Sequence, residues 1–477
     1  MKSSTSLSLR FNGHRANLPI VIIAVIALSI VVGMFLTNTP DEMAAYLLVT
    51  LGCAAPIAFW IATGAKGIPI MPAIAAMHFI YFGVPILRDN IRQMGFGPSE
   101  ILGAAATVSL FLIVATVTWS FLLIVGVRRS NLVVRGIISD VGLKRFMFLG
   151  LLLGISYYIA VFSGLLSWLG PSFGFVRSIA LTSSTVACFV FGSARAKGLL
   201  RGRDWVLAIG SVTTLVILSA GSLYLVGAVT LSLAAAFGYV ITSKRVPWAL
   251  FAAAAVTIVI LHAGKDSMRT KYWLPNTTAS MDITPLQIPG LMKEWVETGL
   301  TAIASDDQYD SVIDRASLLS LLMRAQRLAP DYVPFLEGRS YAVLPEMLVP
   351  RFVNENKITS QTSMNMLNVH FGFQTVEGTT RTAVGWGLIA EGYGNFGYLG
   401  VIGVAIVVGA IAGLFERLSD GAPLMSLPAL TAVAAMMNFI NMEGDAAGIL
   451  TSLFQSLAAI SIMFWLMRLL SKNRRRL

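Results

Sequence analysis

The sequence predicts an all-α, polytopic membrane protein with about twelve transmembrane helices and one large polar loop. Of its 477 residues, 56% are apolar and only 12% are charged, about half the charged fraction of an ordinary soluble domain. Uncharged runs of about 18 or more residues recur along the chain, and each can cross a hydrocarbon core about 30 Å thick as a helix. Helices are expected because they satisfy their own backbone polar groups in lipid.

The apolar runs supply nine predicted spans before the polar loop and three after it. The first run is interpreted as a retained span, because no convincing small-residue cleavage pattern follows it. The run at 205–243 is 39 residues long, so it should form two spans joined near Gly221-Ser222. The predicted spans are 18–36, 43–65, 67–87, 101–127, 146–170, 178–193, 205–243 (two), 246–263, 397–415, 421–442 and 446–467.

Basic residues indicate the orientation of these spans. With both termini in the cytoplasm, the inner segments carry 21 Lys and Arg, whereas the short outer loops carry three, Arg88, Arg92 and Arg177. Lys and Arg are enriched on the cytoplasmic side of membrane proteins, so the polar loop is expected outside, in the periplasm or its equivalent. The same clustering between spans argues against nucleic-acid binding, despite the net charge of +11.

The polar loop divides the chain into three predicted parts. Residues 1–263 form an N-terminal membrane bundle, 264–396 the loop with amphipathic helices, and 397–477 three membrane helices with a basic cytoplasmic tail. The loop carries 25 of the 59 charged residues, 11 basic and 14 acidic. Cytosolic nucleotides cannot reach an external loop, and no GxxxxGK[ST] run is present. A substrate for chemistry there must arrive already activated, and lipid-linked donors are the expected class.

Within the loop, residues 311–328 have helical periodicity, with Val312, Ala316, Leu319 and Met323 on one face. This pattern predicts an amphipathic helix on the membrane or over the bundle. The pair Asp306-Asp307 has no accompanying histidine or DxD pattern, so no metal site is predicted.

Four arginines of the loop are candidate ligands for a lipid diphosphate: Arg315, Arg339, Arg351 and Arg381. Arginine is always charged, and its two parallel N–H donors match phosphate oxygens. For any single one of them, a salt bridge with one of the 14 loop acids is the alternative.

The loop ends in a glycine-rich run that contains Glu391, just ahead of an apolar span. A carboxylate in this place is costly unless it is paired or functional. It could act as a general base on a sugar hydroxyl, or it could be an interfacial cap paired with Arg381. Tyr393, Asn395 and His370 are candidate contacts for an acceptor sugar.

Several of these runs resemble the Wzy-type oligosaccharide repeat-unit polymerases. The matching runs are Asp314-Arg315, Tyr332 to Gly338-Arg-Ser-Tyr341, Leu348-Val-Pro350-Arg351-Phe352 with Lys357, and Glu391-Gly-Tyr393-Gly-Asn395-Phe396-Gly397. The resemblance covers about 310–415 by motif and the rest by layout. The chain departs from the family after Arg351, where Val-Asn-Glu-Asn-Lys replaces a Trp-Pro-Asp-Lys-Pro-like stretch, so the role of Lys357 stays open.

The resemblance implies a metal-independent and cofactor-free glycosyltransferase of the bacterial inner membrane. It would polymerise undecaprenyl-diphosphate-linked repeat units, with a chain-length regulator as a candidate partner, on a fold similar to GT-C-like lipid-donor glycosyltransferases. An O-antigen-type ligase would share the donor chemistry. A lipid-linked sugar flippase is the alternative from another class, although the charge-free spans count against a transporter.

Overall fold

A computed structural model describes residues 18–64, 67–87, 95–125, 140–243, 245–273, 283–304, 317–349, 353–354, 357–359, 361–380, 384–424 and 426–473. This part of the chain is helical, and ten of its helices are long and apolar enough to cross a membrane. The protein is therefore an all-α, multi-pass membrane protein, as the sequence predicts. The chain forms two compact units, and the polar loop contributes to both.

Unit 1 comprises Met1–Arg135, Ile313–Val349 and Lys357–Leu453. Its helices are α1 (Leu18–Leu36), α2 (Pro40–Ala62), α3 (Ile70–His78), α5 (Pro98–Val125), α13 (Leu318–Leu328), α14 (Arg339–Ala342), α15 (Leu344–Leu348), α16 (Thr362–His370), α17 (Val376–Thr379), α18 (Gly387–Ser419) and α19 (Leu427–Phe439). Helix α20 (Ala446–Asn473) begins in unit 1. After α3, a π-helical turn (Phe79–Gly83) and a 3-10 turn (Val84–Leu87) complete the third predicted span.

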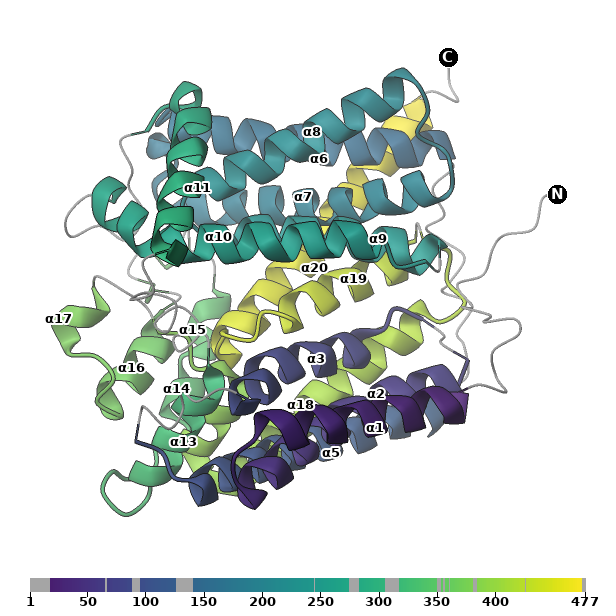
Figure 1. The fold of residues 1–477 in the computed structure, drawn as a ribbon. Coiled ribbons are helices and arrows are strands. Elements are labelled where there is room, and N and C mark those ends of the chain that lie inside the picture. The colour runs from purple at the N-terminus through teal and green to yellow at the C-terminus, as the bar shows by residue number, and fades with distance from the viewer. Residues whose placement is uncertain are drawn as a thin grey trace. The chain divides into compact units, whose positions relative to one another are not determined.

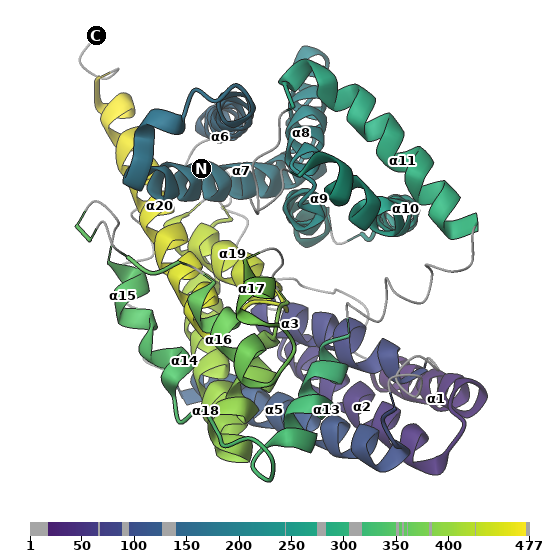
Figure 2. The same cartoon turned by 90° about the vertical axis from the view of Figure 1, so that its left-hand side faces the viewer.

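The long helices of unit 1 lie in the order α18, α5, α2 and α1 (Figure 2). Small residues let α18 approach α5 closely. A Cβ on Gly409 would lie 2.3 Å from the carbonyl oxygen of Ala115, and Gly413, one turn further on, faces Trp119 and Leu122. Small residues four apart are a common way for membrane helices to pack, because lipid supplies no hydrophobic drive between them.

The short helices α13 to α17 gather at one end of the long helices of unit 1 (Figure 1). Helix α13 begins after Ser317, whose side chain accepts a hydrogen bond from the N–H of Ser320. Leu319 and Met323 are buried, which confirms this part of the predicted amphipathic face. The first turns of the predicted helix, with Val312 and Ala316, lie outside the described residues.

Helix α19 corrects one predicted span. The sequence predicts a membrane-long helix over 421–442, but the helix has only 13 residues, about 20 Å at 1.5 Å per residue. Its flanks need not be helical because they are enclosed by protein: Ala422, Ser426 and Met442 are all buried. Irregular backbone is tolerated at membrane depth where protein shields it from lipid.

Unit 2 comprises Gly136–Val312, Pro350–Asn356 and Phe454–Leu477. Its helices are α6 (Asp140–Phe162), α7 (Phe173–Ala196), α8 (Arg203–Gly221), α9 (Leu225–Ser243), α10 (Trp248–Tyr272) and α11 (Ile288–Ala304), with a 3-10 turn at Ser167–Ser172 and another at Pro285–Gln287. Helix α8 ends at Gly221, which confirms the predicted junction within the 39-residue run. Helix α7 packs on α9 where Gly192 and Gly238 each meet backbone of the other helix.

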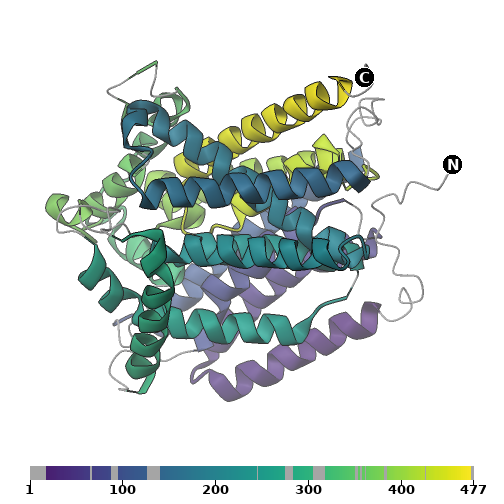
Figure 3. The ribbon, with the colours of Figure 1, turned by 90° about the horizontal axis from the view of Figure 1, so that it is seen from above.

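Helix α11 lies across the ends of other helices of unit 2 (Figures 1 and 3). It touches α10 where a Cβ on Gly299 would lie 2.0 Å from the carbonyl oxygen of Ile260. The indole N–H of Trp295 donates a hydrogen bond to the carbonyl of Leu261 at 2.7 Å. These contacts hold one face of an amphipathic helix against the bundle.

Candidate functional site

The glycine-rich run that ends the polar loop forms a sharp reversal inside α18. Helical geometry breaks at Phe396 (φ −143°, ψ 21°) and Gly397 (φ 60°, ψ −142°). The second conformation is open almost only to glycine. The two limbs, Gly387–Asn395 and the helix after Gly397, then pack so closely that a Cβ on Gly400 would lie 2.0 Å from the carbonyl oxygen of Gly392. The first limb therefore carries Glu391, Tyr393 and Asn395 back along the second.

Glu391 lies at the centre of this limb and is fully buried. Its Oε1 accepts a hydrogen bond from Ser340 Oγ at 2.8 Å and a longer one from Ser363 Oγ at 3.5 Å. Its Oε2 accepts the backbone N–H of Ala446 at 2.6 Å. One carboxylate thus joins α14, α16, α18 and the start of α20.

Asn395 lies one turn after Glu391 on the same face and is also fully buried. Its Oδ1 accepts the backbone N–H of Gly338 at 3.0 Å. Its Nδ2 donates to Ser340 Oγ at 2.8 Å and to the carbonyl of Glu391 at 2.9 Å. Ser340 consequently receives one hydrogen bond from Asn395 and gives one to Glu391.

The segment that these two side chains hold is a tight turn. Glu337 (φ 51°) and Gly338 (φ 87°) both have left-handed backbone conformations, and the first is unusual for a residue with a side chain. The N–H groups of Leu336 and Glu337 donate to the carbonyls of Gly394 and Asn395 at 3.0 and 3.1 Å. Arg339 follows as the first residue of α14, and it is exposed.

Aromatic side chains fill the space around this turn. Phe335 packs edge-on against Tyr393, and Tyr341 stacks on Phe396, with ring centroids 6.0 and 6.4 Å apart. A Cβ on Gly338 would lie 3.0 Å from the Phe396 ring. The Tyr393 hydroxyl donates to a backbone carbonyl at 3.4 Å. The motif thus contacts the 329–341 segment through Tyr393, Asn395 and Phe396 as well as through Glu391.

A second carboxylate of this site, Asp445, is also buried, and the sequence does not predict it. It caps α20, since its Oδ1 accepts the N–H of Gly448 at 2.8 Å. Burial raises the pKa of the Asp445 carboxyl above its ordinary value, because the charged form loses its hydration. The signal in the sequence is an Asp directly before an apolar helix, which marks an N-cap but says nothing of its neighbour Glu391.

The predicted arginines can be located only in part. Arg339 lies beside the Glu391 network, whereas Arg315, Arg351 and Arg381 lie outside the described residues. His370, a predicted sugar contact, bonds the carbonyl of Pro334 through Nε2 at 2.8 Å. Tyr393 and Asn395 are enclosed by protein, so their predicted contacts with a sugar stay predictions.

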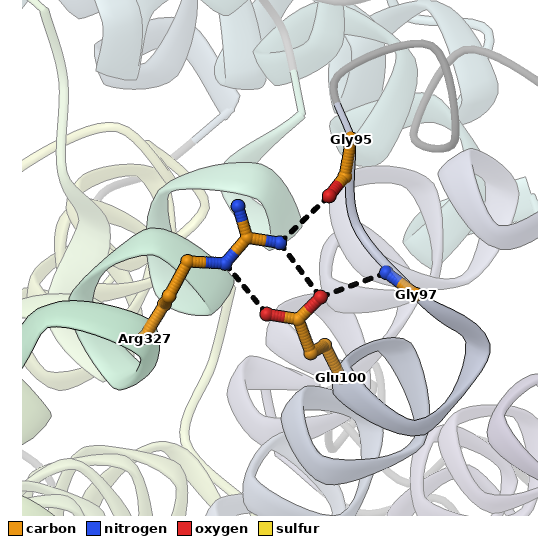
Figure 4. A network of polar contacts seen from close by, with 4 residues as sticks. All are labelled: Gly95, Gly97, Glu100 and Arg327. Atoms are coloured by element: carbon orange, nitrogen blue, oxygen red, sulfur yellow. Dashed lines mark hydrogen bonds and ion pairs between the residues drawn. The ribbon is translucent and has the colours of Figure 1, made fainter.

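Two further cations of the loop hold backbone in place. Arg327 forms a two-pronged ion pair with Glu100, at 2.6 and 2.7 Å, and also donates to the carbonyl of Gly95 at 2.8 Å (Figure 4). This network fixes α13, which leads into the turn, on the start of α5. Lys357 donates to the carbonyl of Met347 at 2.6 Å. Among the described residues, no group of three or more His, Cys, Asp or Glu could hold a metal ion.

Comparison of the chain with protein-family models, with curated proteins and with solved structures finds no match. The chemistry of the site itself is therefore the guide to function.

Proposed function

We propose that this protein polymerises undecaprenyl-diphosphate-linked oligosaccharide repeat units at the periplasmic face of a bacterial inner membrane. One observation carries the proposal. The Glu391-to-Gly397 motif and the Gly338-Arg-Ser-Tyr341 run are about fifty residues apart in sequence but form one hydrogen-bonded site in unit 1. That site includes an exposed arginine, Arg339, at the start of α14, and α14 lies with the other short helices at one end of the long helices of unit 1 (Figure 1).

The proposed chemistry is a glycosyl transfer. An acceptor sugar hydroxyl attacks the anomeric carbon of the growing glycan. The bond from that carbon to the diphosphate oxygen breaks, and the hydroxyl proton passes to a base or to water. The leaving group, a lipid diphosphate, needs stabilisation of its negative charge, which fixed guanidinium groups supply. Arg339 is proposed as one ligand, and Arg315, Arg351 and Arg381 as the others.

Glu391 is the candidate base for this reaction. The sequence predicts Glu391, and a general base must come within hydrogen-bond reach of the hydroxyl. Both oxygens of Glu391 accept hydrogen bonds from the protein, and no part of the residue is exposed. Direct contact with an acceptor sugar would require α14 to move away from this carboxylate.

The location is proposed from the distribution of charge. One set of segments between the spans carries 21 Lys and Arg and the other set of short loops carries three, which favours both termini in the cytoplasm. The Glu391 site then lies at the external surface, where lipid-linked units are available. The substrate, the membrane lipid and a chain-length regulator are the proposed partners.

The decisive experiment uses the purified protein in lipid vesicles with the lipid-linked repeat unit of the source organism. We expect long glycans attached to undecaprenyl diphosphate. Transfer of the glycan to a different acceptor would establish a ligase, and movement of labelled lipid across the bilayer without polymer would establish a flippase.

A matched pair of variants tests the site in the same assay. Arg339→Ala should lower the polymerisation rate at least tenfold. Arg203→Ala removes another exposed arginine, also the first residue of a helix, and should leave the rate unchanged. Equal rates for the two variants would remove Arg339 from the site.

A further inference from the structure

We infer that Glu391 and Asn395 are positioning residues that hold the Gly338–Ser340 turn so that Arg339 faces the donor diphosphate. The inference deepens the proposed function and rests on it for the identity of the ligand. It assigns to Glu391 a role different from that of a base, and it explains why the motif pairs a carboxylate with an amide four residues later.

The contacts fall on the two neighbours of Arg339. Gly338 is held through its N–H by Asn395 Oδ1 at 3.0 Å. Ser340 is held through its hydroxyl by Glu391 at 2.8 Å and by Asn395 at 2.8 Å. Arg339 itself is exposed, and its guanidinium has no hydrogen bond or ion pair with any other described residue. The backbone is thus fixed on both sides of an exposed cation.

The turn needs such support because its backbone is unfavourable on its own. Glu337 has φ 51°, and a non-glycine residue in the left-handed region persists only where its surroundings over-determine it. The carbonyls of Gly394 and Asn395 supply acceptors for this turn at 3.0 and 3.1 Å. The end of the first limb of α18 therefore provides both the side-chain and the backbone partners.

Glu391 and Asn395, together called the clamp, are anchored to a membrane helix by the second carboxylate oxygen of Glu391. Glu391 Oε2 accepts the N–H of Ala446 at the start of α20. Ser340, Glu391 and Asn395 are all fully buried, so water cannot replace a lost hydrogen bond without opening the site. A guanidinium on such a support keeps its position while charge develops on the leaving group, and this preorganisation is what stabilises a transition state electrostatically.

A positioning role and a base role predict different measurements. Loss of a base slows the chemical step and leaves donor binding unchanged. Loss of the clamp weakens donor binding, and it does so only while Arg339 is present. The probe is undecaprenyl diphosphate, the leaving group itself, bound to the full-length protein in lipid nanodiscs.

We expect Asn395→Ala, Ser340→Ala and Glu391→Gln each to raise the Kd for undecaprenyl diphosphate about tenfold. The double variant Arg339→Ala/Asn395→Ala should bind no more weakly than Arg339→Ala alone, because the clamp acts through that side chain. The matched control is Asn368→Ala. This fully buried asparagine also makes two hydrogen bonds, to Trp386 and Val384, but none to the turn, and its loss should leave the Kd unchanged.

A second measurement does not depend on the ligand. A nitroxide is attached at Arg339→Cys in a chain whose native cysteines are replaced by alanine. The electron paramagnetic resonance spectrum of the nitroxide should show restricted motion. Asn395→Ala or Ser340→Ala should increase that motion, although each variant still elutes as folded protein in gel filtration.

The inference is overturned if Asn395→Ala, Ser340→Ala and Glu391→Gln bind undecaprenyl diphosphate like the wild type. It is also overturned if the Kd of the double variant rises by the product of the two single increases, or if the label is equally mobile in every variant. Failure of the wild type to bind undecaprenyl diphosphate, with the label behaving as expected, would instead refute the proposed function and leave the clamp intact.

Discussion

Because the two limbs of α18 lie in close contact at Gly400, we expect a side chain at this position to destabilise the protein. A Cβ at this position would lie 2.0 Å from the carbonyl oxygen of Gly392, whereas ordinary van der Waals contact begins near 3.4 Å. Gly400→Ala must therefore separate the limbs by about the 1.4 Å difference. The atom in the way belongs to backbone and cannot rotate aside, so we expect a cost near the upper end of the roughly 1–3 kcal/mol typical of overpacking.

The matched control is Gly403→Ala in the same helix. A Cβ there meets nothing within 4 Å, and alanine favours a helix over glycine by up to about 1 kcal/mol. The two variants should therefore differ in free energy of unfolding by about 2–4 kcal/mol. Because Glu391 lies on the limb that moves, Gly400→Ala should also lose polymerisation while Gly403→Ala retains it.

The two cysteines of the chain supply the assay. Cys53 in unit 1 and Cys188 in unit 2 are both buried, so the temperature at which each thiol becomes reactive reports the opening of its own unit. Gly400→Ala should lower this temperature for Cys53 and not for Cys188. If Cys53 is protected to the same temperature in both glycine variants, the two limbs do not pack as closely as the structure shows.

Three further predictions concern topology, donor binding and pH. Single cysteines at the exposed positions Glu377 and Arg245 should react differently with an impermeant thiol reagent in intact cells: Glu377→Cys is labelled and Arg245→Cys is not, and the reverse pattern would invert the topology. Arg351→Lys keeps the charge but loses the two-pronged geometry, so polymer should fall sharply at constant protein level; normal polymer would exclude Arg351 as a diphosphate ligand. Burial raises the pKa of Asp445 from its ordinary 3.8, so its contribution to stability is fully present below pH 3.8 and is lost as pH rises through the raised pKa. Asp445→Asn keeps the cap on Gly448 and should flatten this decline in unfolding temperature, whereas an unchanged pH profile would contradict the assignment.

The helical fold follows from features that the sequence displays locally. Uncharged runs give the position of most membrane helices, and α1 has the predicted bounds of 18–36. The junction near Gly221 is also local, because a 39-residue run cannot be one crossing. The short α19 was not predictable in this way. The length of α19 depends on burial of its flanks by other parts of the protein. An apolar run in the sequence does not distinguish residues surrounded by lipid from residues surrounded by protein.

The arrangement of the site is even less predictable from local sequence than the length of α19. Glu391 is conspicuous in sequence as a carboxylate ahead of an apolar span, which suggests an interfacial position with an exposed face. In the structure, α14, α16 and the start of α20 enclose it. Ser340 and Asp445 lie about fifty residues away on either side, and no periodicity relates residues at that separation. Their convergence is a property of the tertiary fold.

The brevity of α19 has a consequence for how the protein enters the membrane. Thirteen residues are fewer than the roughly 17 that a helix needs to span lipid alone, and the next charged residues, Glu443 and Asp445, follow at once. In the folded protein α19 packs on α18 and α3, both of which are synthesised before it. We expect α19 to enter the membrane against these two helices, so that a chain lacking α3 would leave this segment poorly inserted.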